Sequence, residues 1–101
     1  MAKKNNTKTE INELEKPVVQ TFSITAPAAK NVLLAGDFTK WQQQPIEMTK
    51  GADGTWRTSV RLTPGAHPYR FLVDGQWQDD PKCPLHAPNP FGGQDAVRIV
   101  A

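Results

Sequence analysis

Trp41 and Trp77 are large apolar residues in polar surroundings, and their side chains are the first candidates for a chemical role. Three glutamines follow Trp41, and Trp77 lies between Gln76 and Gln78. An indole left in water is unfavourable unless it covers the edge of a core or meets a ligand. Its flat, electron-rich face fits the apolar C–H face of a sugar ring, and nearby amides and bases can hydrogen-bond the hydroxyls. The pair therefore predicts a carbohydrate-binding platform, with cover for a core edge as the alternative.

The stacking of one sugar ring sets the strength expected of such a platform. If stacking removes about 150 Å² of apolar surface from water, it contributes roughly 4 kcal/mol before the costs of association. A dissociation constant near the millimolar range follows for a single short sugar. Longer sugar chains that span both tryptophans should bind more tightly.

Two adjacent carboxylates, Asp79 and Asp80, suggest acid–base catalysis. Glycoside hydrolysis needs two carboxylates on either side of a bound sugar at a defined separation. Neighbouring residues at the end of one strand point in different directions, so this pair does not meet the requirement. We expect no enzymatic activity, and we expect Asp80 and Pro81 to shape a turn.

Cys83, His86 and His67 are the residues that a transition metal would use. A zinc site needs three or four ligands, and the chain offers a single cysteine and two histidines without a second pair. One cysteine also forms no disulfide within the chain. The sequence predicts neither a metal site nor a cofactor.

The balance of charge limits the partners. The 101 residues include 12 Lys and Arg and 10 Asp and Glu, which leaves a formal net charge of +2. Aromatic platforms that bind single-stranded nucleic acid are accompanied by a strong basic excess, which this chain lacks. The longest apolar run, from Val32 to Ala35, is far too short to span a bilayer, and no secretory signal begins the sequence. We expect neither nucleic acid nor membrane as a partner, and a cytoplasmic location.

The chain divides at Pro17 into a polar segment and a domain. Residues 1–16 hold only two aliphatic side chains, Ile11 and Leu14. Such a segment cannot bury enough apolar surface to offset the entropy cost of ordering. We predict a disordered tail over residues 1–16 and one β-sandwich domain over residues 17–101.

Short alternating runs broken by Gly, Pro and Asp predict β-strands in this domain. The clearest run places Trp56, Val60 and Leu62 on one face, so Trp56 is expected in the core. Asp74-Gly75 predicts a two-residue hairpin turn just before the second platform tryptophan. About seven short strands separated by turns predict an all-β, antiparallel sandwich of the immunoglobulin-like kind. Strands are expected at 21–25, 31–35, 46–48, 56–62, 69–73, 76–78 and 97–99, and residues 79–95 are expected to be loop.

Several motifs of the domain together resemble carbohydrate-binding module family 48. This family includes the glycogen-binding domain of AMP-activated protein kinase β subunits and the early set domain at the N-terminus of isoamylases and glucan-branching enzymes. The resemblance implies an early set sandwich that binds α-1,4-glucan, such as glycogen, starch or maltooligosaccharides, without catalysis. It covers about residues 18–100 and rests on Phe22–Ala26, Val32–Trp41, Gly54–Trp56, Leu62–Gly65, Tyr69–Trp77, Asp80-Pro81 and Asn89–Gly93.

The same resemblance implies roles for individual residues. Trp41 and Trp77 correspond to the stacking tryptophans of the glycogen-binding members. Arg70 corresponds to a basic residue that hydrogen-bonds sugar hydroxyls and is usually lysine. Arginine keeps the donors but changes their geometry.

The loop before the last strand completes the implied site. Phe91 corresponds to a hydrophobic residue that inserts beside the sugar. Asp95 stands where the family has an asparagine that contacts hydroxyls. A carboxylate accepts but does not donate, and the neighbouring Gln94 can supply a donor. The expected partners are an α-glucan and a glycogen-metabolism enzyme or kinase.

A regulatory or scaffolding module that contacts proteins and no glycan is the alternative function. The two platform tryptophans distinguish these possibilities. Exposure of Trp41 and Trp77 on one face favours sugar binding, whereas burial of either in a core or a homodimer interface favours the scaffold.

Overall fold

The structure is a computed structural model that describes residues 16–90 and 92–101. The tail predicted over residues 1–16 lies, except for Lys16, outside the described residues, and so does Phe91. The described chain forms nine strands and two short 3-10 turns, where about seven strands were expected. No helix in this part of the chain is long and apolar enough to cross a membrane.

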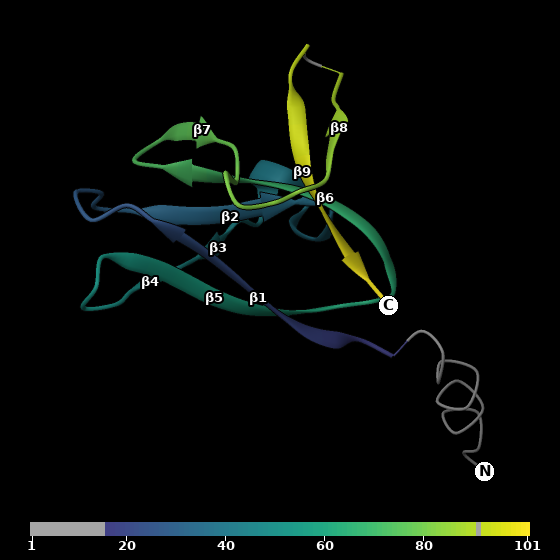
Figure 1. The fold of residues 1–101 in the computed structure, drawn as a ribbon, viewed down its shortest axis with the longest axis horizontal. Coiled ribbons are helices and arrows are strands. Elements are labelled where there is room, and N and C mark those ends of the chain that lie inside the picture. Colours follow the sequence, from purple (N-terminus) through teal and green to yellow (C-terminus); the bar gives the residue numbers. More distant parts are fainter. Residues whose placement is uncertain (1–15, 91) are drawn as a thin grey trace.

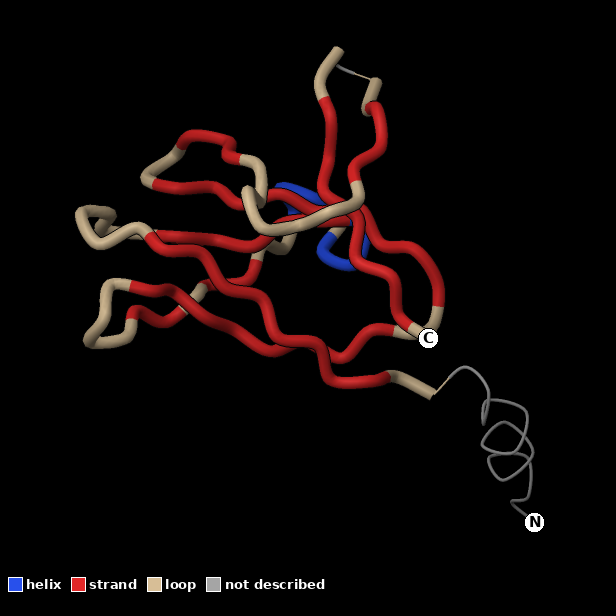
Figure 2. Tube along the Cα trace, in the orientation of Figure 1, coloured by secondary structure: helices blue, strands red, loops and turns tan. Residues whose placement is uncertain are grey.

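Two antiparallel sheets pack face to face, as the sequence predicts for an immunoglobulin-like sandwich (Figures 1 and 2). The three-stranded sheet has the order β1 (Val18–Thr25), β5 (Thr55–Leu62) and β4 (Thr49–Lys50). The six-stranded sheet has the order β3 (Ile46–Glu47), β2 (Val32–Gly36), β6 (Gly65–Val73), β9 (Gln94–Val100) and β8 (His86–Pro88), and β7 (Gln76–Gln78) also pairs with β6.

The core lies between the two sheets and is built from the alternating apolar residues of both. Trp56 is 7% exposed and donates from Nε1 to the carbonyl oxygen of Ala26, so its expected place in the core is confirmed. Arg98 crosses the gap between the sheets, with its guanidinium 4.1 Å from the ring centre of Phe22. The buried apolar side chains of this core are Phe22, Ile24, Ala29, Val32, Leu34, Met48, Trp56, Leu62, Tyr69, Phe71, Val73, Ala96 and Val100.

Two segments differ from the sequence-based prediction. The strand expected at 46–48 is split, because the chain crosses between sheets at the buried Met48; β3 pairs with β2, and β4 pairs with β5. The loop expected over 79–95 contains β8 and the start of β9. Prolines hid β8 from a pattern search, since proline is tolerated on edge strands and β8 is such an edge. As Figure 1 shows, β8 and β9 form a hairpin that projects beyond the other strands.

The turn between β6 and β7 is the two-residue hairpin that Asp74-Gly75 predicts. Both residues have positive φ, 48° and 84°, which is the geometry of a type I′ turn. The Asp74 carboxylate accepts hydrogen bonds from the backbone N–H groups of Lys30 and Asn31, each at 2.9 Å. The hairpin that carries Trp77 is therefore tied to the loop between β1 and β2.

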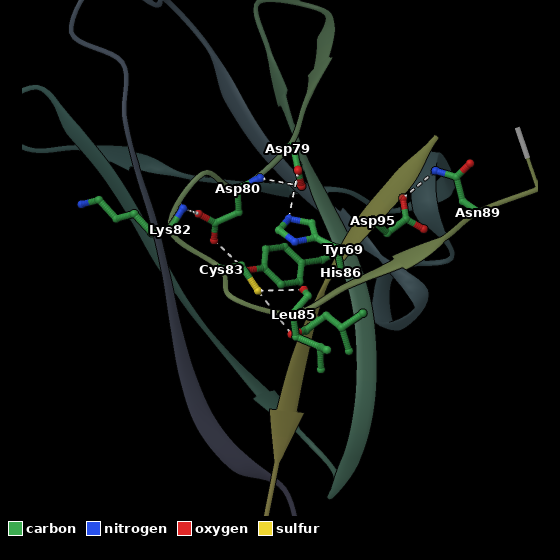
Figure 3. Close-up of polar contacts among 10 residues, drawn as sticks. Tyr69, Asp79, Asp80, Lys82, Cys83, Leu85, His86, Asn89 and Asp95 are labelled. Atoms are coloured by element: carbon green, nitrogen blue, oxygen red, sulfur yellow. Dashed lines mark hydrogen bonds and ion pairs between the residues drawn. The ribbon is translucent and has the colours of Figure 1, made fainter. Parts of the chain in front are cut away.

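Asp80 is a buried carboxylate, 6% exposed, that ties the segment after β7 to the core. The Tyr69 hydroxyl donates to its Oδ2 at 2.6 Å, and the Lys82 N–H donates to its Oδ1 at 3.0 Å (Figure 3). Burial of the phenol, together with the Asp80 carboxylate as its acceptor, raises the pKa of Tyr69 far above its ordinary value. Asp80 is therefore a structural residue of this turn.

Candidate functional site

An open hollow of about 600 Å³ lies on the outer face of the six-stranded sheet. It forms where β7 and β9 separate, because both strands pair with the same edge of β6. β9 pairs with residues 65–69 of β6 and β7 with residues 71–73. The lining residues are Trp41, Gln42, Arg70, Trp77, Asn89, Pro90, Gly93 and Asp95.

Trp77 is held on the outer face of the sheet by β7. It pairs with Leu72 of β6, which places both side chains on the face opposite the core. Its side chain is 37% exposed, so it is one of the large apolar residues that the fold leaves in contact with water. The strand β7 thus presents an indole to the hollow.

Trp41 reaches the hollow from the loop between β2 and β3, at the start of the 3-10 turn Trp41–Gln43. Lys40 and Trp41 both have left-handed backbone conformations, with φ of 53° and 58°. Such conformations cost about 1 kcal/mol or more for residues with a Cβ, and they persist only where the surroundings enforce them. The position of Trp41 is therefore imposed by the fold.

Thr39 enforces that conformation from beneath the turn. Its side chain is 3% exposed, and Oγ1 accepts the Gly36 N–H at 3.0 Å. The same oxygen lies 2.9 Å from the carbonyl oxygen of Trp41 and 3.1 Å from that of Gly36, and its hydroxyl donates to one of the two. One buried hydroxyl thus joins the end of β2 to the backbone of the platform tryptophan.

Arg70 and Asp95 supply the charges of the hollow. Arg70 lies two residues before Leu72 on β6, so it shares the outer face, and its buried Nε has no hydrogen-bond partner among the described residues. Asp95 is 7% exposed and lies in β9, not in the loop where the sequence-based prediction placed it. No ion pair joins the two within the described part of the chain, so one cation and one anion face the hollow separately.

Asn89 organises the rim between β8 and β9, and sequence reasoning missed it. Its Nδ2 donates to Asp95 Oδ1 at 3.0 Å (Figure 3), and its Oδ1 accepts the Gly93 N–H at 3.1 Å. Its own N–H donates to the Gly93 carbonyl at 2.9 Å. An Asn-Pro pair before two glycines was the available signal, since asparagine commonly closes turns through its side chain.

The hollow brings together four of the six predicted binding residues: Trp41, Trp77, Arg70 and Asp95. Gln94 is exposed at the start of β9 and is not among the described residues that line the hollow. Phe91 lies outside the described residues, so its predicted role stays a prediction. Both tryptophans line the same open hollow, with Trp77 exposed and Trp41 half-buried.

The carboxylates considered for catalysis lie outside the hollow. Asp80 accepts a hydrogen bond from the Tyr69 hydroxyl, and Asp79 Oδ2 lies 2.9 Å from His86 Nε2 (Figure 3). The described residues contain no group of three or more His, Cys, Asp or Glu side chains placed to hold a metal ion. The chemistry that the hollow offers is therefore stacking and hydrogen bonding.

Comparisons with known proteins find a matching family model and several similar sequences. A family model described as the glycogen recognition site of AMP-activated protein kinase matches residues 19–94. Protein PTST homolog 2, chloroplastic, of Arabidopsis thaliana is 41% identical over 69 residues, which are 67% of this chain and 13% of that protein. The β-1 subunit of 5′-AMP-activated protein kinase of Sus scrofa is 38% identical over 56 residues, or 55% of this chain and 43% of that sequence.

A solved structure agrees in fold. The maltogenic amylase from S. marinus superposes with a TM-score of 0.68 at 20% identity, over 82% of this chain and 13% of that one. The chain thus spans about an eighth of the length of the amylase and of the Arabidopsis relative.

Proposed function

We propose that this domain, which belongs to the family of the glycogen recognition site of AMP-activated protein kinase, holds α-1,4-glucan by stacking sugar rings on Trp41 and Trp77. The domain is a carbohydrate-binding module of the glycogen-recognition kind. The observation that carries the proposal is that both tryptophans line one open hollow on the outer face of the sheet.

The charged rim of the hollow suits a ligand with hydroxyl groups. Arg70 carries only hydrogen-bond donors, so it pairs only with acceptor groups of a ligand. Asp95 carries only acceptors, so it pairs only with donor groups. A sugar hydroxyl accepts from one and donates to the other. Because the two charges offset each other, the hollow fits a neutral polyol better than a phosphate or a carboxylate.

We propose that the module acts without catalysis. Support comes from the two candidate carboxylates: Asp80 bonds Tyr69 and Asp79 contacts His86, and neither is among the described lining residues. A kinase or an enzyme of glycogen metabolism is the proposed protein partner. The proposed location is cytoplasmic, although three of the similar proteins are named as chloroplastic.

Calorimetric titration of the protein with maltotriose and cyclic maltoheptaose tests the proposed function. We expect binding with dissociation constants around the millimolar range or tighter. Cellotriose, which has the same hydroxyl groups but β-1,4 linkages, should bind much more weakly. If neither α-glucan gives a heat of binding at concentrations several times the expected dissociation constant, the proposal is refuted.

Replacement of Thr39 by valine should weaken glucan binding, although Thr39 is buried and is not among the described residues that line the hollow. The change keeps the shape but removes the oxygen that holds the Trp41 backbone, so we expect about a threefold to tenfold loss of affinity. The buried Gly36 N–H also loses its acceptor, at about 1–3 kcal/mol of stability. Thr39→Ser is the matched control, because it retains the hydroxyl and should keep affinity within about twofold. Titration of both variants under conditions where both are folded measures the difference, and equal affinities would exclude this positioning role.

A further inference from the structure

A second groove of about 500 Å³ continues from the glucan site along the outer face of the six-stranded sheet. It shares Trp41, Asn89, Pro90 and Asp95 with the first hollow, so the two form one surface on either side of Trp41. The remaining lining residues of this second groove are Ala66, Pro68, Leu85, His86, Ala87, Pro88, Val97 and Ile99.

The register of β6 and β9 explains why the groove is in line with the platform. Ala66 pairs with Ile99 and Pro68 with Val97. Arg70 follows at the next outward position of β6, in the first hollow. Arg70 lies four positions after Ala66 along the strand, which is about 14 Å at about 3.4 Å per residue. The groove therefore lengthens the binding face by about that distance.

The second groove presents apolar side chains that the core does not use. Ile99 is 57% exposed and Leu85 is 44% exposed, and they are among the most exposed large apolar residues of the described chain. Its one carboxylate, Asp95, lies at the boundary with the first hollow and is bonded by Asn89. His86 is the other titratable lining residue, and its Nε2 contacts Asp79. Such a surface suits an uncharged ligand with apolar faces.

We propose that the second groove binds further sugar residues of the same glucan chain, beyond those that stack on Trp41 and Trp77. This inference rests on the proposed function. An α-glucan that crosses Trp41 meets the groove without a break, because the same indole lines both hollows. The proline and aliphatic side chains contact the C–H faces of the sugar rings, and the groove is open enough for the hydroxyls to keep their water.

Chain length separates this second groove from the platform in an experiment. Maltotriose fits the platform alone, whereas a long linear amylose fragment reaches into the groove. We expect Ile99→Asp, which places a charge on the groove floor, to weaken binding of the long fragment by about fivefold and to leave maltotriose unchanged. Leu85→Asp should do the same, and because Leu85 lies in a loop between strands, this variant does not rest on the folding of β9.

Val19→Asp is the matched control. Val19 is 55% exposed, close to the 57% of Ile99, but it lies on β1 in the other sheet. The Val19→Asp variant should leave the affinities for maltotriose and for the long fragment unchanged. If wild type binds no α-glucan, the proposed function itself fails. If wild type binds maltotriose but both groove variants hold the long fragment as tightly as wild type, the groove proposal alone is overturned.

Two other outcomes would also overturn the groove proposal. One is an equal loss for maltotriose and for the long fragment, which would mean that the changes act on the platform. The other is a wild-type protein that sediments as a dimer while Ile99→Asp sediments as a monomer. In that case a second copy of the chain covers the groove.

Discussion

Replacement of Trp77 by alanine should remove measurable binding of maltotriose and weaken cyclic maltoheptaose by about thirtyfold or more. Trp77 lines the hollow from an edge hairpin and is 37% exposed, so part of its indole face is open to the ligand. Loss of about 100 Å² of apolar contact corresponds to about 2.5 kcal/mol, which exceeds what a single rim hydrogen bond contributes. Titration calorimetry of the variant against wild type measures the loss.

Trp77→Tyr is the control for this prediction. A tyrosine keeps a flat aromatic face at the same position, so binding should persist at a reduced level, within about tenfold of wild type. Urea unfolding should show that both variants stay folded, because β7 has only three residues and lies outside the main strand path. Unchanged affinity in the folded alanine variant would place the sugar elsewhere.

Replacement of Asp80 by alanine should cost the fold about 3 kcal/mol. The change leaves the Tyr69 hydroxyl, in a side chain that is 1% exposed, without its acceptor. It also removes the acceptor of the Lys82 N–H. Buried groups that lose a charged partner cost about 1–3 kcal/mol each. In a domain of about 100 residues, such a loss lowers the melting temperature by roughly 12 °C or more.

Asp79→Ala is the matched control for the stability measurement. Asp79 is the adjacent carboxylate, but its side chain is 44% exposed, and its oxygens accept the backbone N–H of Asp80 at 2.9 Å and contact the ring of His86. An exposed pair of this kind contributes about 1 kcal/mol or less. If Asp79→Ala destabilises the protein as much as Asp80→Ala does, the buried contact with Tyr69 is not what holds this turn.

The buried hydrogen bond between Tyr69 and Asp80 also makes the stability of the protein fall at alkaline pH. The pKa of Tyr69 is raised in the folded state, mainly by burial and then by its bond to Asp80, whereas an unfolded tyrosine titrates near pH 10. Above about pH 10 the unfolded chain therefore loses a proton that the folded chain keeps. The free energy of unfolding from this group then drops by about 1.4 kcal/mol per pH unit, while below pH 10 its contribution is fully present.

Tyr69 is the single tyrosine of the chain, so phenolate absorbance reports this residue alone. Folded protein should show no phenolate signal near pH 10 and should acquire it together with unfolding. Tyr69→Phe should remove the extra loss of stability between pH 10 and 11. A phenolate signal that rises near pH 10 while the protein remains folded would contradict the buried hydrogen bond.

Much of the fold follows from short-range patterns. Alternation in β5 places Trp56 inward because side chains alternate strictly along a strand. The two turn residues Asp74 and Gly75 predict the hairpin because a type I′ turn requires positive φ at both positions. These are local consequences of covalent geometry, and they placed Trp56 in the core before any tertiary contact was known.

Other features depend on which strands meet. The strand β8 was missed because its pairing with β9, not its proline-containing sequence, creates it. Asp80 was assigned to a turn, but its burial depends on Tyr69, which precedes it by 11 residues. The strained backbone of Lys40 and Trp41 has no local signature, because neither residue favours positive φ and the buried hydroxyl of Thr39 stabilises it.

The sequence determined most of the strands, the hairpin turn and the core position of Trp56, since patterning and turn chemistry act over a few residues. Its local pattern only suggested that Trp41 and Trp77 lie outside the core, and the resemblance to a known family made this a definite prediction. Only the tertiary structure decided that they share one hollow with Arg70 and Asp95. Their position in one hollow depends on β7 and β9 pairing with the same edge of β6, and β9 is far from β6 in the chain. Such pairings are selected by burial of the whole core, because a period-two pattern specifies which face of a strand is apolar but not which strand lies beside it.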